Sequence, residues 1–295
     1  MTGHVRGVSP DGATVRIDAH QHFWKYDARE YDWIDERMGV LRRDFLPADF
    51  EPLLRQAGFR GSILVQVRQS LEETRWMLEL AEKHPFIVGV VGWVDLLSPE
   101  AAAQLDGFRG SKLVGVRHIV QSEPDERFML REAFLRGVSL LEERGLAYDI
   151  LIYPRHLRVA TELVATFPGV RFVLDHAAKP EIRRGEIRDW GADLRGLASH
   201  PNVVCKLSGL TTEADWKAWT PEGIRPYLDV AWDAFGPERL LIGSDWPVCT
   251  LAADYARALG LVLDYLSRRP AAEQEAVCGG NAARFWNLSL EEPKR

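Results

Sequence analysis

The chain alternates short apolar runs with longer segments of helical periodicity, from about residue 15 to about residue 245. Runs that are apolar on both faces are typical of parallel strands covered by helices. Helical spacing of apolar residues marks the segments 71–84, 128–145, 154–167, 191–200 and 221–236. We interpret as strands the runs VRIDA, GSILVQV, FIVGVVGW, LVGVRHI, LAYDILIY, VRFVLDH, VVCKLSG and LLIGSD. Eight strands at about 37 residues per unit predict an α/β fold, a (β/α)8 TIM barrel forming one domain over residues 15–290.

A doubly wound open sheet is the alternative architecture. A nucleotide-binding sheet of that kind carries a GxGxxG motif after its first strand, and no such motif follows the first run here. Strands also continue to about residue 240, which favours closure of the sheet. We therefore expect a barrel with its active site at the C-terminal ends of the strands.

The composition limits the classes of partner. The net charge is −6, and no apolar run is long enough to cross a bilayer. Nucleic acids and acidic membranes select clustered Lys and Arg, so we expect neither as a partner.

Residues 1–14 are polar and Gly-rich, which predicts a flexible tail without a secretory signal and a cytoplasmic location. Three distant cysteines predict reduced thiols. Homo-oligomer formation stays open.

Two segments are longer than a barrel needs. Residues 25–50 are aromatic and charged, and residues 210–226 carry two of the ten tryptophans. Loops that follow strands build the active-site face of a barrel, so we expect both segments to shape a lid or a substrate pocket. The alternative is that they are exposed decoration.

Two histidines one residue apart, His20 and His22, follow the first strand in IDAHQHFW. Residues two apart in a strand point to the same side, so Asp18, His20 and His22 are expected to project together toward the barrel mouth. Such a pair can ligate one divalent ion or hydrogen-bond a substrate oxygen. It can also be purely structural and hydrogen-bond the backbone.

An aspartate, Asp245, ends the eighth strand in LLIGSDWP. The eighth strand of a closed barrel neighbours the first, which brings Asp245 close to His20 and His22 across more than two hundred residues of sequence. The alternative role for Asp245 is to cap the next helix.

Polar residues recur where the other apolar runs stop, which is typical of a barrel active site. They are Arg117, His118 and Gln121 after the fourth strand, Asp175 and His176 after the sixth, and Lys206 and Ser208 after the seventh. Cations at such a site can orient a hydroxyl-rich or anionic ligand and stabilise an oxyanion. Arg117 and Lys206 can instead be interior charges paired with Asp149 or Asp175.

These stretches together resemble the amidohydrolase superfamily, and within it the branch of sugar-lactone and pyrone-type lactonases. The resemblance rests on IDAHQHFW, VGWVDL, VGVRHIVQ, YDILIYPRHL, VLDHAAKP, VVCKLSGL and LLIGSDWPVC, and it extends from residue 17 to about 290. By this resemblance, His20 and His22 match the HxH motif of the family. His176 matches the family's histidine after the sixth strand, and Asp245 matches its aspartate after the eighth. The fifth strand, DILIYP, lacks a histidine or a lysine, so a two-metal centre is not expected.

The resemblance implies a hydrolase that opens a lactone ring, most directly a sugar-derived lactone such as an L-fucono- or L-rhamnono-lactone. We assign Asp245 as the general base for water, with His176, His20 and His22 polarising the carbonyl directly or through one ion. Arg117, His118, Lys206 and Ser208 are expected to contact the substrate, with Trp24 and Trp246 as apolar walls. Either no cofactor is required, or one Zn-like divalent cation binds at His20, His22 and Asp245.

Two other functions stay open. Related barrels with the same histidine and aspartate pattern are metal-dependent decarboxylases of aromatic or muconate-type acids. A barrel that binds a ligand without catalysis is the other alternative, although all the acid and base residues are present.

Overall fold

Eight parallel strands form a nearly closed barrel in the computed structural model, which describes residues 15–288. The strand order is β1 to β8 in sequence. The predicted tail, residues 1–14, and the last two residues of the predicted domain lie outside the described residues. The strands are β1 (Ile17–Gln21), β2 (Gly61–Val65), β3 (Ile87–Gly92), β4 (Leu113–His118), β5 (Ala147–Ile150), β6 (Arg171–Leu174), β7 (Val203–Leu207) and β8 (Leu240–Ile242). All eight predicted strands and the TIM-barrel fold are confirmed.

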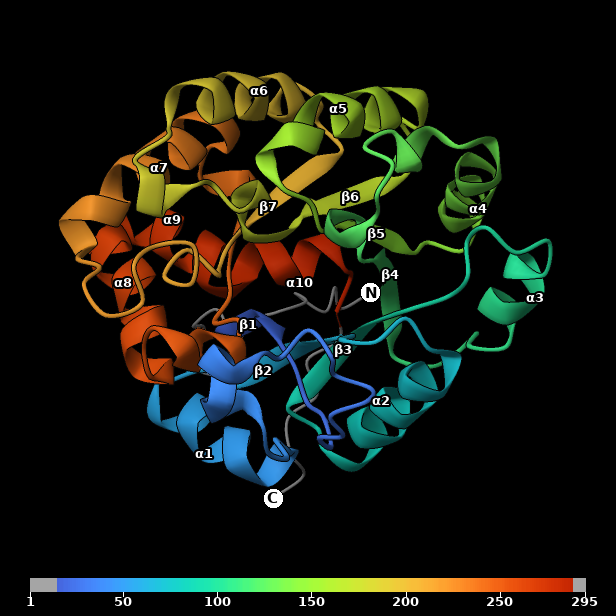
Figure 1. Ribbon diagram of the computed structural model, residues 1–295, viewed down its shortest axis with the longest axis horizontal. Coiled ribbons are helices and arrows are strands. Elements are labelled where there is room, and N and C mark those ends of the chain that lie inside the picture. The colour runs from blue at the N-terminus through green and yellow to red at the C-terminus, as the bar shows by residue number, and fades with distance from the viewer. Residues whose placement is uncertain (1–14, 289–295) are drawn as a thin grey trace, which may run out of the picture.

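Helices surround the strands in a ring (Figure 1). The helices of the described residues are α1 (Pro47–Gln56), α2 (Leu71–Lys83), α3 (Ala101–Asp106), α4 (Glu132–Glu143), α5 (Leu157–Thr166), α6 (Arg188–Ala198), α7 (Pro221–Phe235), α8 (Tyr255–Leu266), α9 (Ala271–Glu275) and α10 (Asn281–Phe285). The five predicted helices are present. The expected loop 25–50 ends earlier than predicted, because α1 begins at Pro47, a favoured residue for the first turn of a helix. Among residues 15–288, no helix could span a membrane.

Side-chain caps fix where several helices begin. Ser70 accepts hydrogen bonds from the backbone N–H groups of Glu72 and Glu73 at the start of α2. Thr220 and Asp254 cap α7 and α8 in the same way. Each cap satisfies backbone donors that have no partner within the helix, so the strand-to-helix loops end at defined positions.

Strands β1 and β8 meet through backbone hydrogen bonds at their C-terminal ends. The amide of Asp245 donates to the His20 carbonyl at 2.8 Å, and the amide of His22 donates to the Trp246 carbonyl at 2.7 Å. Gly243 makes this approach feasible, because a Cβ there would lie 2.9 Å from the Cβ of His20. The closure places the last strand's aspartate directly beside the first strand's histidines, as the sequence predicted.

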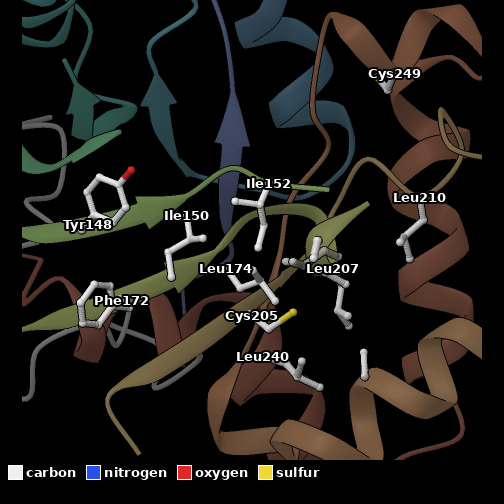
Figure 2. Close-up of a cluster of buried hydrophobic side chains, with 14 of the residues drawn as sticks. Tyr148, Ile150, Ile152, Phe172, Leu174, Cys205, Leu207, Leu210, Leu240 and Cys249 are labelled. Carbon is white, nitrogen blue, oxygen red and sulfur yellow. The ribbon is translucent and has the colours of Figure 1, made fainter. Parts of the chain in front are cut away.

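The core has two layers. The outer layer lies between strands and helices, and Figure 2 shows part of it, with Ile150, Leu174, Leu207 and Leu240 on the neighbouring strands β5 to β8. The inner layer fills the barrel interior with side chains from alternate strand positions, including Ala147, Val173, Val204 and Leu241. Trp286, which follows α10, packs into this inner layer, and α10 lies across the middle of the ring in Figure 1. The C-terminal segment therefore covers the end of the barrel interior into which Trp286 packs.

Replacing Trp286 with alanine is expected to destabilise the protein by about 3–5 kcal/mol, because it opens a large cavity in the barrel interior. Trp286 is only 4% exposed, whereas Trp33 is 40% exposed and provides a matched control. Urea unfolding measures both variants. Equal shifts of the unfolding midpoint for Trp286→Ala and Trp33→Ala would contradict this role of the C-terminal segment.

Candidate active site

A cavity of about 830 Å³ opens at the C-terminal ends of the strands. Both long segments contribute to it, residues 25–50 through Trp33 and Met38 and residues 210–226 through Glu213 and Trp216, which confirms that they shape a pocket. The lining residues are His22, Glu30, Asp32, Trp33, Met38, Val67, Arg68, Gln69, Ser70, Arg117, Ile119, Gln121, Ser122, Glu123, Leu151, Tyr153, His176, Lys179, Thr212, Glu213, Trp216, Asp245, Val248 and Leu251.

Four predicted residues converge on the floor of this cavity. The Nε2 atoms of His20 and His22 are 3.1 Å apart. Asp245 Oδ1 lies 3.3 Å from His22 Nε2 and 3.8 Å from the Nε2 atoms of both His20 and His176. His22, His176 and Asp245 line the cavity, and His20 is fully buried against them. The sequence predicted this cluster, and the structure brings it together.

Hydrogen bonds on the far side of each ring orient the imidazoles. His22 Nδ1 lies 2.7 Å from the Val65 carbonyl, to which only a protonated nitrogen can donate, so Nδ1 carries a proton. His176 Nδ1 lies 2.8 Å from Ser208 Oγ. His20 Nδ1 lies 3.3 Å from both Asp175 Oδ1 and Lys206 Nζ. Such outer contacts fix the ring orientation of metal-binding and catalytic histidines.

Burial sets the charge state of the floor. It lowers the pKa of His176 to about 4 and holds the pKa of His20 well below its usual range, because the imidazolium form would lose hydration. Burial alone would raise the pKa of Asp245, but the neighbouring histidines, first His176 and then His22 through its hydrogen bond, hold it below its usual range. An ionised carboxylate therefore faces neutral His20 and His176 rings near neutral pH.

The floor suits one divalent cation. The candidate ligand atoms of His20, His176 and Asp245 all lie within 4.8 Å of one another. The predicted set had His22 in place of His176, and His22 Nε2 lies within 3.3 Å of both His20 and Asp245. Imidazole nitrogens with one carboxylate oxygen are a donor set that Zn²⁺ prefers. The residues present therefore fit a single ion.

Asp18 does not join this cluster, contrary to the period-two prediction. The register of β1 on β2 shifts between Asp18 and Gln21, so the alternation of side chains is interrupted. Asp18 instead accepts from the backbone amide of Ser244 at 2.9 Å and from the hydroxyl of Tyr255 at 3.2 Å. It thus fastens β1 to the residues that follow β8.

His176 stands at the start of a left-handed turn. All four residues from His176 to Lys179 have positive φ, between 49° and 60°, and Asp245 has φ of 58°. Such a conformation costs roughly 1–2 kcal/mol per non-glycine residue. Strain of this kind persists where the surroundings hold the backbone in place, and it concentrates at functional sites.

A buried ion cluster lies behind His20. Lys206 Nζ is 2.5 Å from Asp149 Oδ2 and 2.9 Å from Asp175 Oδ1, and all three side chains have no exposure. Arg117 Nη1 is 2.8 Å from Asp175 Oδ2 and 3.3 Å from His20 Nε2. Arg117 also lines the cavity, whereas Lys206 does not. Lys206 therefore takes the interior, carboxylate-paired position that was the alternative to a substrate contact.

The structure places four other predicted substrate contacts away from the cavity lining. His118 pairs with Glu123 at 2.7 Å and stacks on Phe128. Ser208 holds the ring of His176. Trp24 and Trp246 are buried in an aromatic cluster around Phe45.

The lining also contains functional candidates that were not predicted from the sequence. The tryptophans on the cavity wall are Trp33 and Trp216, which come from the two long segments. Arg68, Lys179 and Glu213 add charged groups to the wall. Lys179 stands within VLDHAAKP, three residues after His176, so its place after the sixth strand was the available signal.

The chain is similar to known proteins over almost its whole length. The family model described as Amidohydrolase matches residues 17–288. An L-fucono-1,5-lactonase of Burkholderia multivorans is 46% identical over 95% of this chain and 97% of its own length. One of Burkholderia ambifaria is 39% identical over 93% and 96%. A crystal structure of a Burkholderia multivorans amidohydrolase with bound Zn is 45% identical, with a TM-score of 0.91, over 93% of this chain and all of that one.

Gly209 provides a test of how tightly His176 is held. Its φ is +67°, and an added Cβ would lie 2.7 Å from His176 Nδ1. Gly209→Ala is expected to lower the free energy of unfolding by backbone strain and by displacement of the ring, together about 2–4 kcal/mol. Gly185→Ala is the control, because φ there is +71° with nothing within 4 Å. Equal losses of unfolding free energy in the two variants, measured by thermal unfolding, would show that the His176 ring moves aside at no energetic cost.

Proposed function

The chain belongs to the amidohydrolase family, and from this premise we propose that it is a lactonase that opens a sugar-derived lactone of the L-fucono-1,5-lactone type. The observation that carries the proposal is the floor of the cavity, where Asp245 meets His20, His22 and His176 within 3.8 Å. This arrangement supports hydrolysis of an ester, which needs a base for water and positive charge for the carbonyl oxygen.

Asp245 is the base in this proposal. Its pKa is held low, so it is ionised at neutral pH and can accept a proton from the attacking water. Its carboxylate contacts the three histidines through Oδ1, which leaves Oδ2 to take the proton. When the acyl–oxygen bond of the ring breaks, the protonated carboxyl returns the proton to the leaving ring oxygen.

Arg117 stabilises the carbonyl oxygen as negative charge grows on it, whereas His176 belongs to the donor set for an ion. The Arg117 side chain lines the cavity. Arg117 is held by Asp175 and by the carbonyl of Gln66, so its guanidinium is preorganised. A fixed cation in a buried site stabilises an oxyanion without reorganisation, which lowers the barrier to attack by water.

We propose that one divalent cation, most simply Zn²⁺, binds at His20, His176 and Asp245, with His22 in reach. The donor set supports this, and so does the relative of known structure that has bound Zn. When bound, such an ion acts as a Lewis acid toward the carbonyl and lowers the pKa of water. Asp175 and Ser208 orient His20 and His176 for it, and the Val65 carbonyl orients His22.

The decarboxylase alternative receives no comparable support. Two relatives that are 46% and 39% identical over almost the whole chain are both named lactonases. We therefore propose a small-molecule lactone as the partner. A cytoplasmic location stays a prediction, and homo-oligomer formation stays open.

Asp245→Asn is expected to lower kcat for the lactone at least 10²-fold with a smaller change in KM, because the variant retains shape but cannot accept the proton. A pH-stat assay of acid release measures the rate. Asp233→Asn, on the exposed surface of α7, is the control and should keep wild-type turnover. Turnover within twofold of wild type in Asp245→Asn would remove Asp245 as the base.

His20→Asn is expected to weaken binding of the divalent ion at least 10-fold, because it removes an imidazole nitrogen from the donor set. Elemental analysis and titration of the chelated protein with Zn²⁺ measure stoichiometry and affinity, and His200→Asn outside the site is the control. Activity of the wild type should fall on chelation and return with Zn²⁺. Full activity in a metal-free sample would leave the histidines as hydrogen-bonding groups only.

A further inference from the structure

Two side chains of opposite charge, Lys179 and Glu213, lie together on the cavity wall next to the catalytic floor. Lys179 follows β6 and Glu213 follows β7, so neighbouring strands deliver them. Lys179 Nζ is 3.6 Å from Glu213 Oε1. Neither residue belongs to the floor cluster, and the proposed chemistry uses neither.

The backbone ties this pair to His176. Lys179 closes the left-handed turn that His176 opens, and its amide donates to the His176 carbonyl at 2.8 Å. The loop that carries Glu213 is fastened in turn, because the amide of Arg183 donates to the Glu213 carbonyl at 3.1 Å. Gly209 of the same loop packs against the His176 ring. The pair therefore has a defined position relative to the reacting carbonyl.

The two charged groups do not satisfy each other. Their separation of 3.6 Å is longer than a normal hydrogen bond. Lys179 Nζ also lies 5.8 Å from the ring centre of Tyr153, another lining residue. Both side chains are only about one-fifth exposed, at 21% and 22%. Within residues 15–288, the ammonium and the carboxylate make no hydrogen bond of normal length, so both retain capacity for a ligand.

The charges of the wall favour a neutral ligand over an acidic one. The lining holds five carboxylates, on Glu30, Asp32, Glu123, Glu213 and Asp245, and three cations, on Arg68, Arg117 and Lys179. Each cation already has an acidic neighbour, since Arg68 pairs with Glu30 at 2.7 Å and Arg117 with Asp175. An anionic group bound beside Lys179 would face Glu213, whereas a hydroxyl can accept from the ammonium and donate to the carboxylate.

We propose that Lys179 and Glu213 determine specificity by binding adjacent hydroxyl groups of the lactone ring, with Lys179 donating to one oxygen and Glu213 accepting from the hydroxyls. This inference rests on the proposed lactonase function, and it identifies the ring hydroxyl groups as the part of the substrate that the cavity wall binds. A buried polar pair discriminates strongly against a ligand that leaves it without partners. Partial exposure of this pair reduces the expected discrimination.

The test compares two substrates of the same ring size, a polyhydroxylated sugar 1,5-lactone and the unsubstituted 1,5-lactone. Lys179→Met and Glu213→Gln should each lower kcat/KM for the hydroxylated lactone roughly 10–100-fold, mainly through KM, because a charged hydrogen bond to substrate is lost. The unsubstituted lactone should lose less than about twofold, since it has no hydroxyl to bind. Bound-metal stoichiometry should not change, because neither residue is in the donor set.

Lys217→Met and Glu186→Gln are the matched controls, because both residues are exposed and neither lines the cavity. They should leave kcat/KM for both lactones at wild-type values. Equal losses on the two substrates in Lys179→Met and Glu213→Gln, or no loss on either, would overturn the specificity role while leaving the lactonase function intact. A wild-type protein that opens neither lactone would overturn the proposed function itself and this inference with it.

Discussion

The ion cluster inside the barrel is the constraint on which the active site depends. Asp149, Asp175 and Lys206 are completely buried, and charges in such a position are tolerated only when they are compensated. Each lies two residues beyond an inner-layer residue, namely Ala147, Val173 and Val204, so the cluster is the next layer of the barrel interior. Strands β5 and β7 supply Asp149 and Lys206, the first residue after β6 supplies Asp175, and β4 supplies Arg117. The cluster can form only when the barrel is assembled, and it then fixes His20 from behind.

The reactive groups lie on backbone that the scaffold holds under strain. His176 and Asp245 both have positive φ, and they lie two residues after β6 and three residues after β8. The hydrogen bond from the Asp245 amide to the His20 carbonyl holds Asp245 in its strained conformation. The close packing of Gly209 against the His176 ring does the same for His176. Strain offset by packing elsewhere is a general means of preorganising a site, and here it aims a neutral imidazole and an ionised carboxylate at one cavity.

The sequence predicted the catalytic floor because its residues follow buried strands, and strand ends in a barrel share one face. The predictions were wrong where the direction of a side chain depends on a local irregularity of the backbone. The shift of register after Asp18 turned that carboxylate away from the cavity, and Trp24 and Trp246 pack into an aromatic cluster while Trp33 and Trp216 take the wall. Lys206 illustrates a different limit, since its residue type is equally compatible with a substrate contact and with an interior ion pair. Only the positions of Asp149 and Asp175 decide between them.

In the proposed mechanism, Asp245 and His176 act as one catalytic unit on the floor of the cavity. Groups that act as a unit show non-additive losses, because removing either one disables the step that both serve. The measurement is kcat for lactone opening in Asp245→Asn, His176→Asn and the double variant. The double variant is expected to be no more than about threefold slower than the slower single variant. Losses that multiply in the double variant would instead show that the two residues act independently.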